Sequence, residues 1–322
     1  MHALSILTSV LAVLVAFSRL RAKYLRAAKA SSRRKAISYS SERVLIVGAS
    51  SGVGREIALQ YTKRGARVAI IGRRSDQLGA VLDECVSAAP FETRYLAITA
   101  DFAAPESAAR ARQAIEDHWN GLDTLVITAG VSAVRLFMDS VKSSKPGVAD
   151  LQRAREIATA AADGNLVAPL VAAAAFLPMM ESSSSNPAIL LLSSVAAVIP
   201  APSRALYAAT KASSLLFYQA LAIEHPRITF SIVLPGTIEG DFRASAVDVP
   251  AVSTPVTYGD QDSNSTLSKK LSRSKVALRC IEAADHGDRT VWMPSWYQFA
   301  HALYWIVPSA VERGARKKYN VK

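Results

Sequence analysis

Short apolar runs and longer helical patterns alternate along most of this chain. The apolar runs have the length of buried strands and are residues 44–47, 67–71, 95–99, 125–128, 188–192, 228–234 and 290–293. Helical patterns separate them at residues 55–64, 75–88, 105–119, 150–180 and 205–224. Strands that are joined through a helix pair in parallel, because a parallel neighbour requires a long crossover. The alternation predicts an α/β fold, a doubly wound parallel sheet in a single domain.

The positive charge of the chain is confined to its two ends. The formal net charge is +12, but residues 44–311 contain 24 Lys/Arg and 24 Asp/Glu. Residues 1–43 contain nine basic residues and one acid, and residues 312–322 contain five and one. A neutral folded body disfavours a nucleic-acid partner. Basic ends favour contact with an anionic membrane surface.

An apolar segment at the N-terminus predicts a membrane anchor at residues 1–20. Residues 3–18 are uncharged and mostly apolar, and with their neighbours they approach the ~20 residues that span a bilayer. The basic residues follow this run, whereas a secretory signal peptide has them first. We therefore expect an uncleaved anchor in the endoplasmic reticulum membrane, a polar, basic linker at 21–42, and a cytosolic folded domain. A mitochondrial presequence is the alternative, because residues 1–41 contain no acid.

Cysteine and histidine usage excludes disulfide and zinc scaffolds. The two cysteines, Cys85 and Cys280, are far apart in the sequence, and no CxxC is present. The five histidines are scattered without a metal-ligand spacing. We therefore expect no metal site.

Several candidate site residues directly follow predicted strands. In a doubly wound sheet, ligands bind at the carboxyl ends of the strands. The residues at those ends are Gly48, Asp101, Ala129, Ser194 and Gly236. The fold would therefore bring these distant residues to one edge of the sheet.

A glycine-rich turn joins the first strand to the first helix. Its spacing is G-x-x-x-G-x-G, and a plain turn is the alternative interpretation. Glycines at such a turn let the backbone approach a pyrophosphate beside the positive end of the helix dipole, as in the dinucleotide site of a Rossmann fold. We predict that the turn binds a cofactor through Gly48, Ser50, Ser51, Gly52, Val53 and Gly54.

The residues after the second strand select between nicotinamide cofactors. An acid there would bind a ribose 2′-hydroxyl and indicate NAD. This chain has Arg73 and Arg74, whose guanidiniums suit a 2′-phosphate and favour NADP(H). Two solvated arginines are the alternative. Asp101 is predicted to lie near the adenine, unless it only caps the helix that follows.

Tyr207 and Lys211 are four residues apart in a helical pattern, so they lie on one helix face. A phenol has a pKa of ~10, and a nearby cation lowers that pKa toward the catalytic range. Ser194 could add a hydrogen bond to the same reacting oxygen. Such Tyr/Lys pairs also occur on solvated helices, so the pair alone is weak evidence.

Together these motifs resemble the short-chain dehydrogenase/reductase family over about residues 43–240. The resemblance implies a hydride moving between the nicotinamide and a carbonyl or alcohol. Tyr207 would exchange the proton, Lys211 would lower its pKa and hold the nicotinamide ribose, and Ser194 would orient the substrate oxygen. Asn165 would hold a water that links Lys211 to solvent, although it could also be a packing residue. Further cofactor contacts are implied at Ala129, Gly130, Pro235, Gly236 and Ile238.

Two positions depart from the family pattern. Thr128 stands where the family often has Asn, so one Asn contact is lost. Gly240 stands where a Thr often reaches the cofactor, and Thr237 could compensate. The turns after the fourth and sixth strands are therefore expected to differ from those of the family.

The C-terminal third bears on the substrate. Residues 237–289 contain a Ser/Thr/Asp-rich run and are expected to form a substrate lid on the Rossmann domain, which spans 43–291. Residues 292–322 hold three of the four tryptophans, followed by basic residues, which indicates a segment at the lipid–water boundary. Packing on the core or on a homodimer partner is the alternative.

These observations predict a membrane-associated, NADP(H)-dependent oxidoreductase of lipid metabolism with a lipophilic carbonyl or alcohol substrate. The chain resembles the membrane-anchored hydroxysteroid-dehydrogenase-like branch of the family, and a 3-ketosphinganine reductase is one alternative. A catalytically idle NADP-binding sensor or scaffold is another. The presence of Ser194, Tyr207 and Lys211 disfavours that second alternative.

Overall fold

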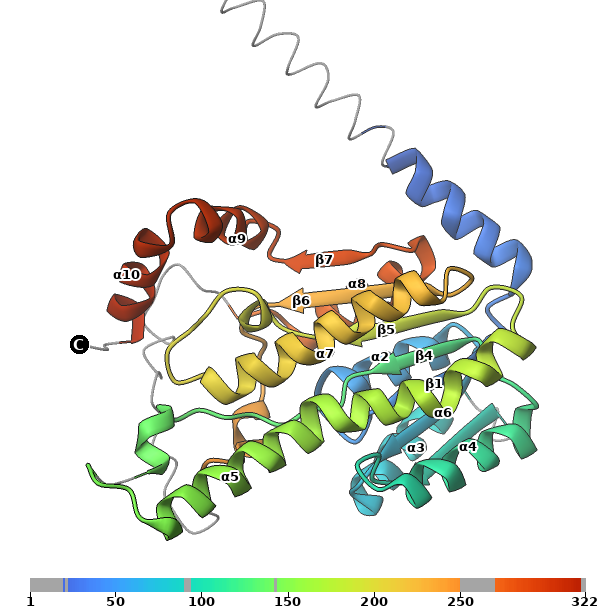
Figure 1. Ribbon diagram of the computed structural model, residues 1–322. Coiled ribbons are helices and arrows are strands. Elements are labelled where there is room, and N and C mark those ends of the chain that lie inside the picture. The colour runs from blue at the N-terminus through green and yellow to red at the C-terminus, as the bar shows by residue number, and fades with distance from the viewer. Residues whose placement is uncertain (1–19, 21–22, 90–93, 142–143, 250–269, 320–322) are drawn as a thin grey trace, which may run out of the picture.

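Seven strands of the described chain form one parallel sheet. The computed structural model describes residues 20, 23–89, 94–141, 144–249 and 270–319. The strands are β1 (Arg43–Val47), β2 (Arg67–Gly72), β3 (Tyr95–Thr99), β4 (Thr124–Ile127), β5 (Ala188–Leu192), β6 (Thr229–Pro235) and β7 (Thr290–Met293). Their order is β3-β2-β1-β4-β5-β6-β7, with every neighbouring pair parallel (Figure 1). The predicted doubly wound Rossmann sheet is confirmed, and its topological switch point lies between β1 and β4.

Helices cover both faces of this sheet (Figure 1). One layer contains α2 (Gly52–Lys63), α3 (Ser75–Ala88) and α8 (Arg273–His286), and the other contains α4 (Pro105–Trp119), α6 (Ala168–Ser183) and α7 (Ala205–Glu224). β4 and β5 are buried at every position, as parallel strands between two helical layers must be. Each layer has its own apolar cluster, which explains why the strands carry continuous apolar runs.

α5 (Val148–Ala162) and α6 form one long helix with a π-helical segment, η3 (Asp163–Val167), at its centre. Among the described residues this is the helix that is long and apolar enough to cross a membrane, with a mean hydropathy of 1.6 over a stretch of 18 residues. Phe176 and Met180 on α6 are fully buried against the sheet, so core packing accounts for its apolar character. The anchor predicted at 1–20 lies outside the described residues, apart from Leu20.

Residues 23–36 form a helix, whereas we expected a polar linker at 21–42. Arg33 is only 2% exposed, and its Nη2 donates to Thr124 Oγ1 (2.6 Å) and Glu42 Oε1 (3.1 Å). The helix is therefore joined to the first residues of the sheet through a buried guanidinium. Sequence composition could not show this, because the same arginines suit a solvated linker.

Two further arginines of this helix form ion pairs with the domain. Arg34 pairs with Glu42 (2.9 Å) and with Asp285, and Arg26 pairs with Asp288 (2.7 Å). Burial alone would raise the pKa of the Glu42 carboxyl, but Arg33 and Arg34 hold that pKa below its usual value. These side chains are committed to the protein itself, so they are not free to contact a membrane surface.

The predicted lid, 237–289, is divided between a short helix and a core helix. The short helix η5 (Phe242–Ser245) lies near Tyr207, whose ring its Phe242 contacts. α8, in contrast, is a layer of the fold, and it is fully buried at Val276, Ala277 and Cys280. The lid prediction was therefore wrong for α8, whose apolar residues repeat with helical spacing. The Ser/Thr/Asp-rich run, 254–268, lies outside the described residues.

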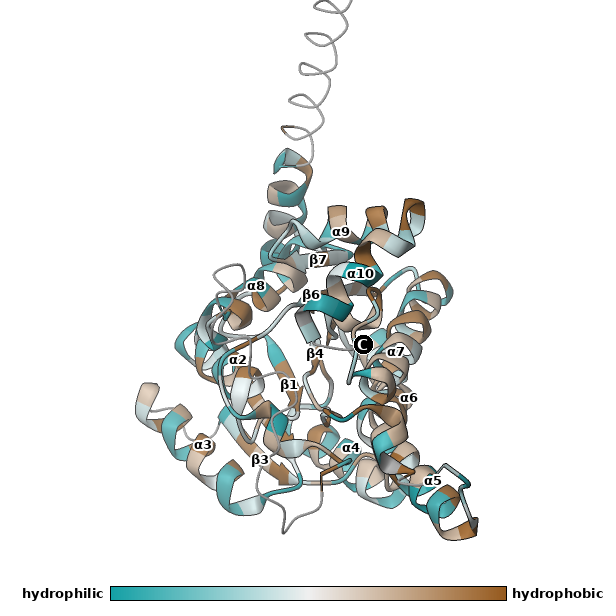
Figure 2. Ribbon diagram, turned by 90° about the vertical axis from the view of Figure 1, so that its left-hand side faces the viewer, coloured by the Kyte–Doolittle hydropathy of each residue, from teal (hydrophilic) through white to brown (hydrophobic). Residues whose placement is uncertain are grey.

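The C-terminal segment, 292–322, begins inside the sheet. β7 crosses the predicted domain boundary at 291, and α9 (Tyr297–Ile306) and α10 (Pro308–Tyr319) follow. Trp292 and Tyr297 pack against the core, whereas the outer residues of α9 are exposed. α9 and the N-terminal helix lie on the same side of the molecule, that of β7, but at opposite ends of the strands (Figure 1). α9 carries hydrophobic residues outward (Figure 2).

Candidate active site

The turn after β1 lies so close to the end of β4 that only glycine fits. Gly48 has a positive φ of 94°, and a Cβ there would lie 2.6 Å from the Ala129 Cα. A Cβ on Gly54 would lie 2.5 Å from Thr128 Oγ1. Gly52 begins α2 with a φ of 60°, which L side chains rarely adopt. The glycine spacing thus brings the first turn of α2 onto the switch point, leaving backbone N–H groups accessible to a pyrophosphate.

Thr128, which stands at the family's Asn position, fastens this turn. Its hydroxyl lies 3.0 Å from the Val47 carbonyl oxygen and 3.1 Å from the Gly48 carbonyl oxygen, and it donates to them. Thr128 therefore makes hydrogen bonds of its own at the family's Asn position, and these bonds hold the backbone after β1 against the end of β4.

A polar cluster stands beside the glycine turn. Arg74 Nη2 donates to Ser50 Oγ (2.8 Å) and Ser51 Oγ (3.0 Å), and Arg73 is exposed next to it. α2 has no acid in its first turn, so the positive end of its dipole is not neutralised there. The cluster could hold a phosphate. The side chain of Val53, in contrast, is 8% exposed and packs in the core.

Asp101 caps a turn after β3. Its side chain is exposed, and Oδ1 accepts a hydrogen bond from the Ala103 N–H (3.0 Å) ahead of α4. The N-cap residue of α4 itself is Ala104, without a side-chain cap, so Asp101 fastens the preceding turn and does not cap the helix. An adenine contact stays a prediction.

Asn165 lies in the π-helical segment and is fully buried. Its Oδ1 accepts from the Val131 N–H (2.9 Å), and its Nδ2 donates to the Val131 carbonyl (3.0 Å) and Thr210 Oγ1 (3.0 Å). It therefore joins the chain after β4 to α7, one residue before Lys211. π-helical turns occur often at functional sites. The water-holding role of Asn165 stays a prediction.

The Ser194 hydroxyl lies beside the Tyr207 phenol, where it favours the phenolate and lowers the pKa of Tyr207. Ser194 Oγ also accepts from the Ala196 N–H (3.1 Å), which fixes it at the start of η4 (Val195–Ala197). The Phe242 ring meets the Tyr207 ring edge-on, at a centroid distance of 5.9 Å. The phenol thus lies between a hydroxyl partner and an apolar wall.

The pKa of Tyr207 lies above its usual value, contrary to our expectation. Burial raises it, and the Ser194 hydrogen bond and the positive charge of Arg204 offset this only in part. Arg204 lies against the phenol ring, with its Cζ 5.5 Å from the ring centroid. The Lys211 ammonium, one turn along the helix, instead donates to the Leu192 carbonyl (3.3 Å).

Lys211 is buried at the centre of the site, with 3% of its surface exposed. Burial lowers the pKa of its ammonium to about 8. A Cβ on Gly130 would lie 3.0 Å from Lys211 Nζ and 2.8 Å from Asn165 Oδ1. The predicted residue Gly130 therefore leaves the space that both side chains occupy.

The end of β6 closes the site on its other side. Gly236, after Pro235, lies so close to α9 that a Cβ would be 3.0 Å from the Tyr297 ring. Ile238 pairs with Leu271 in a parallel bridge and packs against the α2–α8 cluster, so its side chain supports the fold. A cofactor contact of Ile238 would have to use its backbone.

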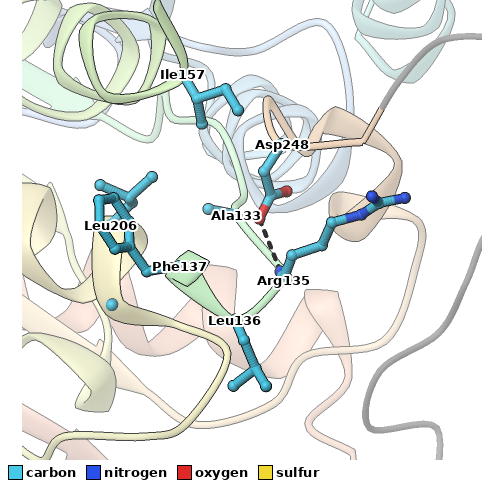
Figure 3. Close-up of a pocket in the computed structure, with 8 residues that line it drawn as sticks. Ala133, Arg135, Leu136, Phe137, Ile157, Leu206 and Asp248 are labelled. Atoms are coloured by element: carbon cyan, nitrogen blue, oxygen red, sulfur yellow. Dashed lines mark hydrogen bonds between the residues drawn. The ribbon is translucent and has the colours of Figure 1, made fainter. Parts of the chain in front are cut away.

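A small pocket lies beside the predicted catalytic residues and does not include them (Figure 3). It is lined by Ala133, Arg135, Leu136, Phe137, Ile157, Ala205, Leu206 and Asp248. The buried Asp248 carboxylate accepts from the Val134 N–H (2.8 Å) and the Arg135 N–H (2.7 Å). It thereby fastens the segment after η5 to the loop after β4.

The sequence predictions missed three residues around this site: Arg204, Phe242 and Asp248. Arg204 stands three residues before Tyr207, so helical spacing could have drawn attention to it. Phe242 and Asp248 stand in the predicted lid, where no periodic pattern indicates which side chains point inward. Only the tertiary structure could identify those two.

The switch-point glycines and the Ser194–Tyr207 contact beside a buried lysine are features of a Rossmann-type oxidoreductase. The sequence profile of the short chain dehydrogenase family matches residues 42–249, and the chain belongs to that family. The resemblance expected for residues 43–240 is therefore confirmed.

Relatives in plants are similar over most of the chain. The protein named 11-beta-hydroxysteroid dehydrogenase A of Arachis hypogaea is 28% identical, over 86% of this chain and 75% of its own. The 11-beta-hydroxysteroid dehydrogenase-like 3 of Arabidopsis thaliana is 29% identical, over 84% of this chain and 79% of its own.

A solved structure supports the fold. It is the alcohol dehydrogenase of the archaeon Thermococcus sibiricus, complexed with 5-hydroxy-NADP. The TM-score is 0.61 at 18% sequence identity, over 78% of this chain and 94% of that one. At this identity the likeness concerns the architecture.

Removing the buried charge of Lys211 should stabilise the protein at neutral pH. Its folded pKa of about 8 lies below its usual 10.5, so the unfolded chain binds the proton more tightly. The resulting destabilisation is fully present below pH 8 and disappears as the pH rises through the unfolded pKa. Lys211→Met should raise the free energy of unfolding at pH 7 by up to about 3 kcal/mol.

Urea unfolding of wild type and variant at neutral pH and near the unfolded pKa measures this difference. Lys63→Met, which removes an exposed lysine, is the control and should show no such pH-dependent gain. A Lys211→Met protein that is less stable than wild type at pH 7 would contradict the prediction.

Proposed function

We propose that this protein is a membrane-anchored, NADP(H)-dependent oxidoreductase that interconverts a carbonyl and an alcohol of a lipophilic substrate. One observation carries the proposal: the Ser194 hydroxyl lies beside the Tyr207 phenol at the carboxyl edge of the sheet, and Lys211 is buried one turn along the same helix as Tyr207. A Tyr/Lys pair on a solvated helix would have neither the hydroxyl partner nor the burial. The neighbouring glycine turn explains why these groups face a cofactor site.

Tyr207 supplies the proton in the reduction. The phenol gives its proton to the substrate oxygen as a hydride reaches the carbonyl carbon, and the product is the alcohol. Bound NADP(H) supplies the hydride. Ser194 orients the same oxygen by a hydrogen bond. The raised pKa of Tyr207 keeps the phenol protonated at neutral pH, which suits a proton donor.

Lys211 and Asn165 return the proton. A lysine with a pKa of about 8 exchanges protons near neutral pH. Asn165 Oδ1 lies on the same side of Gly130 as Lys211 Nζ, since a Cβ on Gly130 would meet both atoms. We infer that these two groups hold the water path from solvent to Tyr207.

NADP(H) is the proposed cofactor because of the end of β2. Gly72, Arg73 and Arg74 stand there without a carboxylate, and Arg74 already bonds two hydroxyls of the glycine turn. The Arg74 guanidinium and the hydroxyls of Ser50 and Ser51 thus lie together at the end of β2. Such a group of donors fits a 2′-phosphate, which carries charge and several acceptor oxygens. The NADP analogue in the archaeal alcohol dehydrogenase agrees with this choice.

A lipophilic substrate fits the surroundings of Tyr207. The Phe242 ring forms an apolar wall beside the phenol, and the plant relatives carry the name of hydroxysteroid dehydrogenases. Steroids and a 3-keto sphingoid base are therefore candidate substrates.

The proposed membrane contact rests on α9 and on the N-terminal apolar run. The outer residues of α9 form an apolar face: Trp296 (50% exposed), Phe299 (75%), Leu303 (46%), Trp305 (75%) and Ile306 (76%). Exposed apolar faces with tryptophans are typical of the lipid–water boundary. Since α9 and the N-terminal helix lie on the same side of the molecule, that of β7, both could reach the same bilayer (Figure 1, Figure 2). The basic residues after the apolar run favour a catalytic domain on the cytosolic side, and we propose the endoplasmic reticulum.

Tyr207→Phe should reduce carbonyl-dependent NADPH oxidation by at least about 100-fold, because it removes the proton donor. NADPH affinity should be retained, since the phenol ring is kept. NADPH absorbance with steroid ketones, long-chain aldehydes and 3-ketosphinganine measures turnover, and NADPH fluorescence measures binding. Unchanged turnover in the variant would refute the proposed role. NADPH binding without any turnover in the wild type would favour a nucleotide sensor.

The double variant Arg73→Ala/Arg74→Ala should weaken NADPH binding by roughly 10–100-fold, because charged hydrogen bonds to the 2′-phosphate are lost. NADH, which lacks that phosphate, should bind equally well to variant and wild type. Arg67→Ala, an exposed arginine at the other end of β2, is the control. An equal loss for both cofactors would contradict NADP(H) preference.

Phe299→Asp/Ile306→Asp should uncouple α9 from lipid. When liposomes containing anionic phospholipid are added to the full chain, tryptophan fluorescence should shift to the blue in wild type and less in this variant. Leu216→Asp, at an exposed leucine of α7, is the matched control and should behave as wild type. A liposome-independent dimer that the double variant dissolves would show that α9 covers a second copy instead.

A further inference from the structure

Arg204 stands immediately before α7, three residues before Tyr207, and its guanidinium lies beside the Tyr207 ring. We propose that Arg204 is a positioning residue for Tyr207, whose guanidinium is fixed beside the phenol ring to stabilise the phenolate that remains after proton transfer. This inference rests on the proposed role of Tyr207. It concerns a residue outside the glycine turn and the Ser–Tyr–Lys–Asn set.

The guanidinium is held by two bonds to the loop after β4. Arg204 Nη1 donates to Ser132 Oγ (2.9 Å) and to the Ala133 carbonyl (3.0 Å). Ser132 and Ala133 are buried, so the two acceptors hold the guanidinium in a fixed position. The Arg204 Cζ is 5.5 Å from the Tyr207 ring centroid, within the range of a cation–π contact.

The backbone directly before Arg204 is strained, as backbone at functional sites often is. Ser203 has a positive φ of 57° and is buried. A non-glycine residue in this region is uncommon, and such strain is retained where the surroundings over-determine it, often at active sites. The turn at Ser203 leads directly into the residue that contacts Tyr207.

The charges around the two residues agree with this role. Burial lowers the pKa of Arg204, and nearby Arg243 lowers it further, whereas Tyr207, Tyr319 and Asp248 raise it. Around Tyr207, the groups that favour the phenolate are the Ser194 hydroxyl and Arg204. Lys211 donates to Leu192 instead, so Arg204 is the cation that acts on the ring in this structure.

Two substitutions separate the charge of Arg204 from its hydrogen bonds. Arg204→Gln keeps N–H donors for Ser132 and Ala133 but removes the charge, and Arg204→Lys keeps the charge but loses the planar fork. Arg227→Gln, which removes an exposed arginine next to β6, controls for the change in net charge. Arg204→Met is a second neutral variant for the case in which Arg204→Gln does not fold.

The titration of Tyr207 itself is the readout, and it requires no substrate. Fluorotyrosine is incorporated into the full chain, and the Tyr207 fluorine signal is assigned by its absence in Tyr207→Phe. Ring fluorination lowers the pKa of the phenol, which brings the titration into a range where the protein remains folded. The neutral variants should raise the Tyr207 midpoint by about one pH unit relative to wild type. Arg204→Lys and Arg227→Gln should leave it close to wild type.

Two results would overturn the proposal. One is an unchanged Tyr207 midpoint in the neutral variants. The other is a shift in Arg204→Lys as large as in Arg204→Gln, which would show that Arg204 acts through its hydrogen bonds to the loop after β4 and not through its charge. The test is independent of the proposed reaction. A wild-type protein without NADPH-dependent turnover would defeat the proposed function, while the titration would still decide whether Arg204 stabilises the phenolate.

Discussion

The rest of the structure depends on the contact between the backbones after β1 and β4. Gly48 passes so close to Ala129 that no Cβ fits, and Thr128 bonds back to the Gly48 carbonyl. At this switch point the crossovers leave in opposite directions, so a space opens beyond the strand ends. The helix dipole of α2, the buried Lys211 and the Ser194–Tyr207 pair all border that space. A bulkier residue at Gly48 would separate the two halves of the site.

The sheet could be predicted from the sequence because parallel strands buried on both faces read as continuous apolar runs. Two elements could not. The helix at residues 23–36 was expected to be a linker because its basic residues suit a solvated segment. Its arginines instead pair with acids from two segments, at Glu42 and at Asp285 and Asp288 by the end of α8, and local patterns do not encode such contacts. α8 was assigned to a lid because an irregular segment precedes it, although its own apolar residues repeat with helical spacing.

The positions of the candidate site residues were predictable from the order of strands and helices. The pKa of a side chain and its contacts were less predictable, because both depend on residues that are distant in the sequence. Ser194, Tyr207 and Lys211 were placed on one edge by chain order alone. The expected effect of Lys211 on Tyr207 stays a prediction, because in this structure burial raises the pKa of the phenol and Lys211 donates to the Leu192 carbonyl. Arg204 carries no motif, and its importance follows from a turn at Ser203 and two acceptors after β4.

The helix at residues 23–36 has a mechanical consequence. It is about 20 Å long, and its arginines grip the sheet at Glu42 and the end of α8 at Asp285 and Asp288. It therefore acts as a strut and not as a tether. A tethered domain samples many orientations, whereas this helix holds residue 23 at a fixed position relative to the sheet. The distance and direction from residue 23 to the catalytic edge are therefore set by these ion pairs.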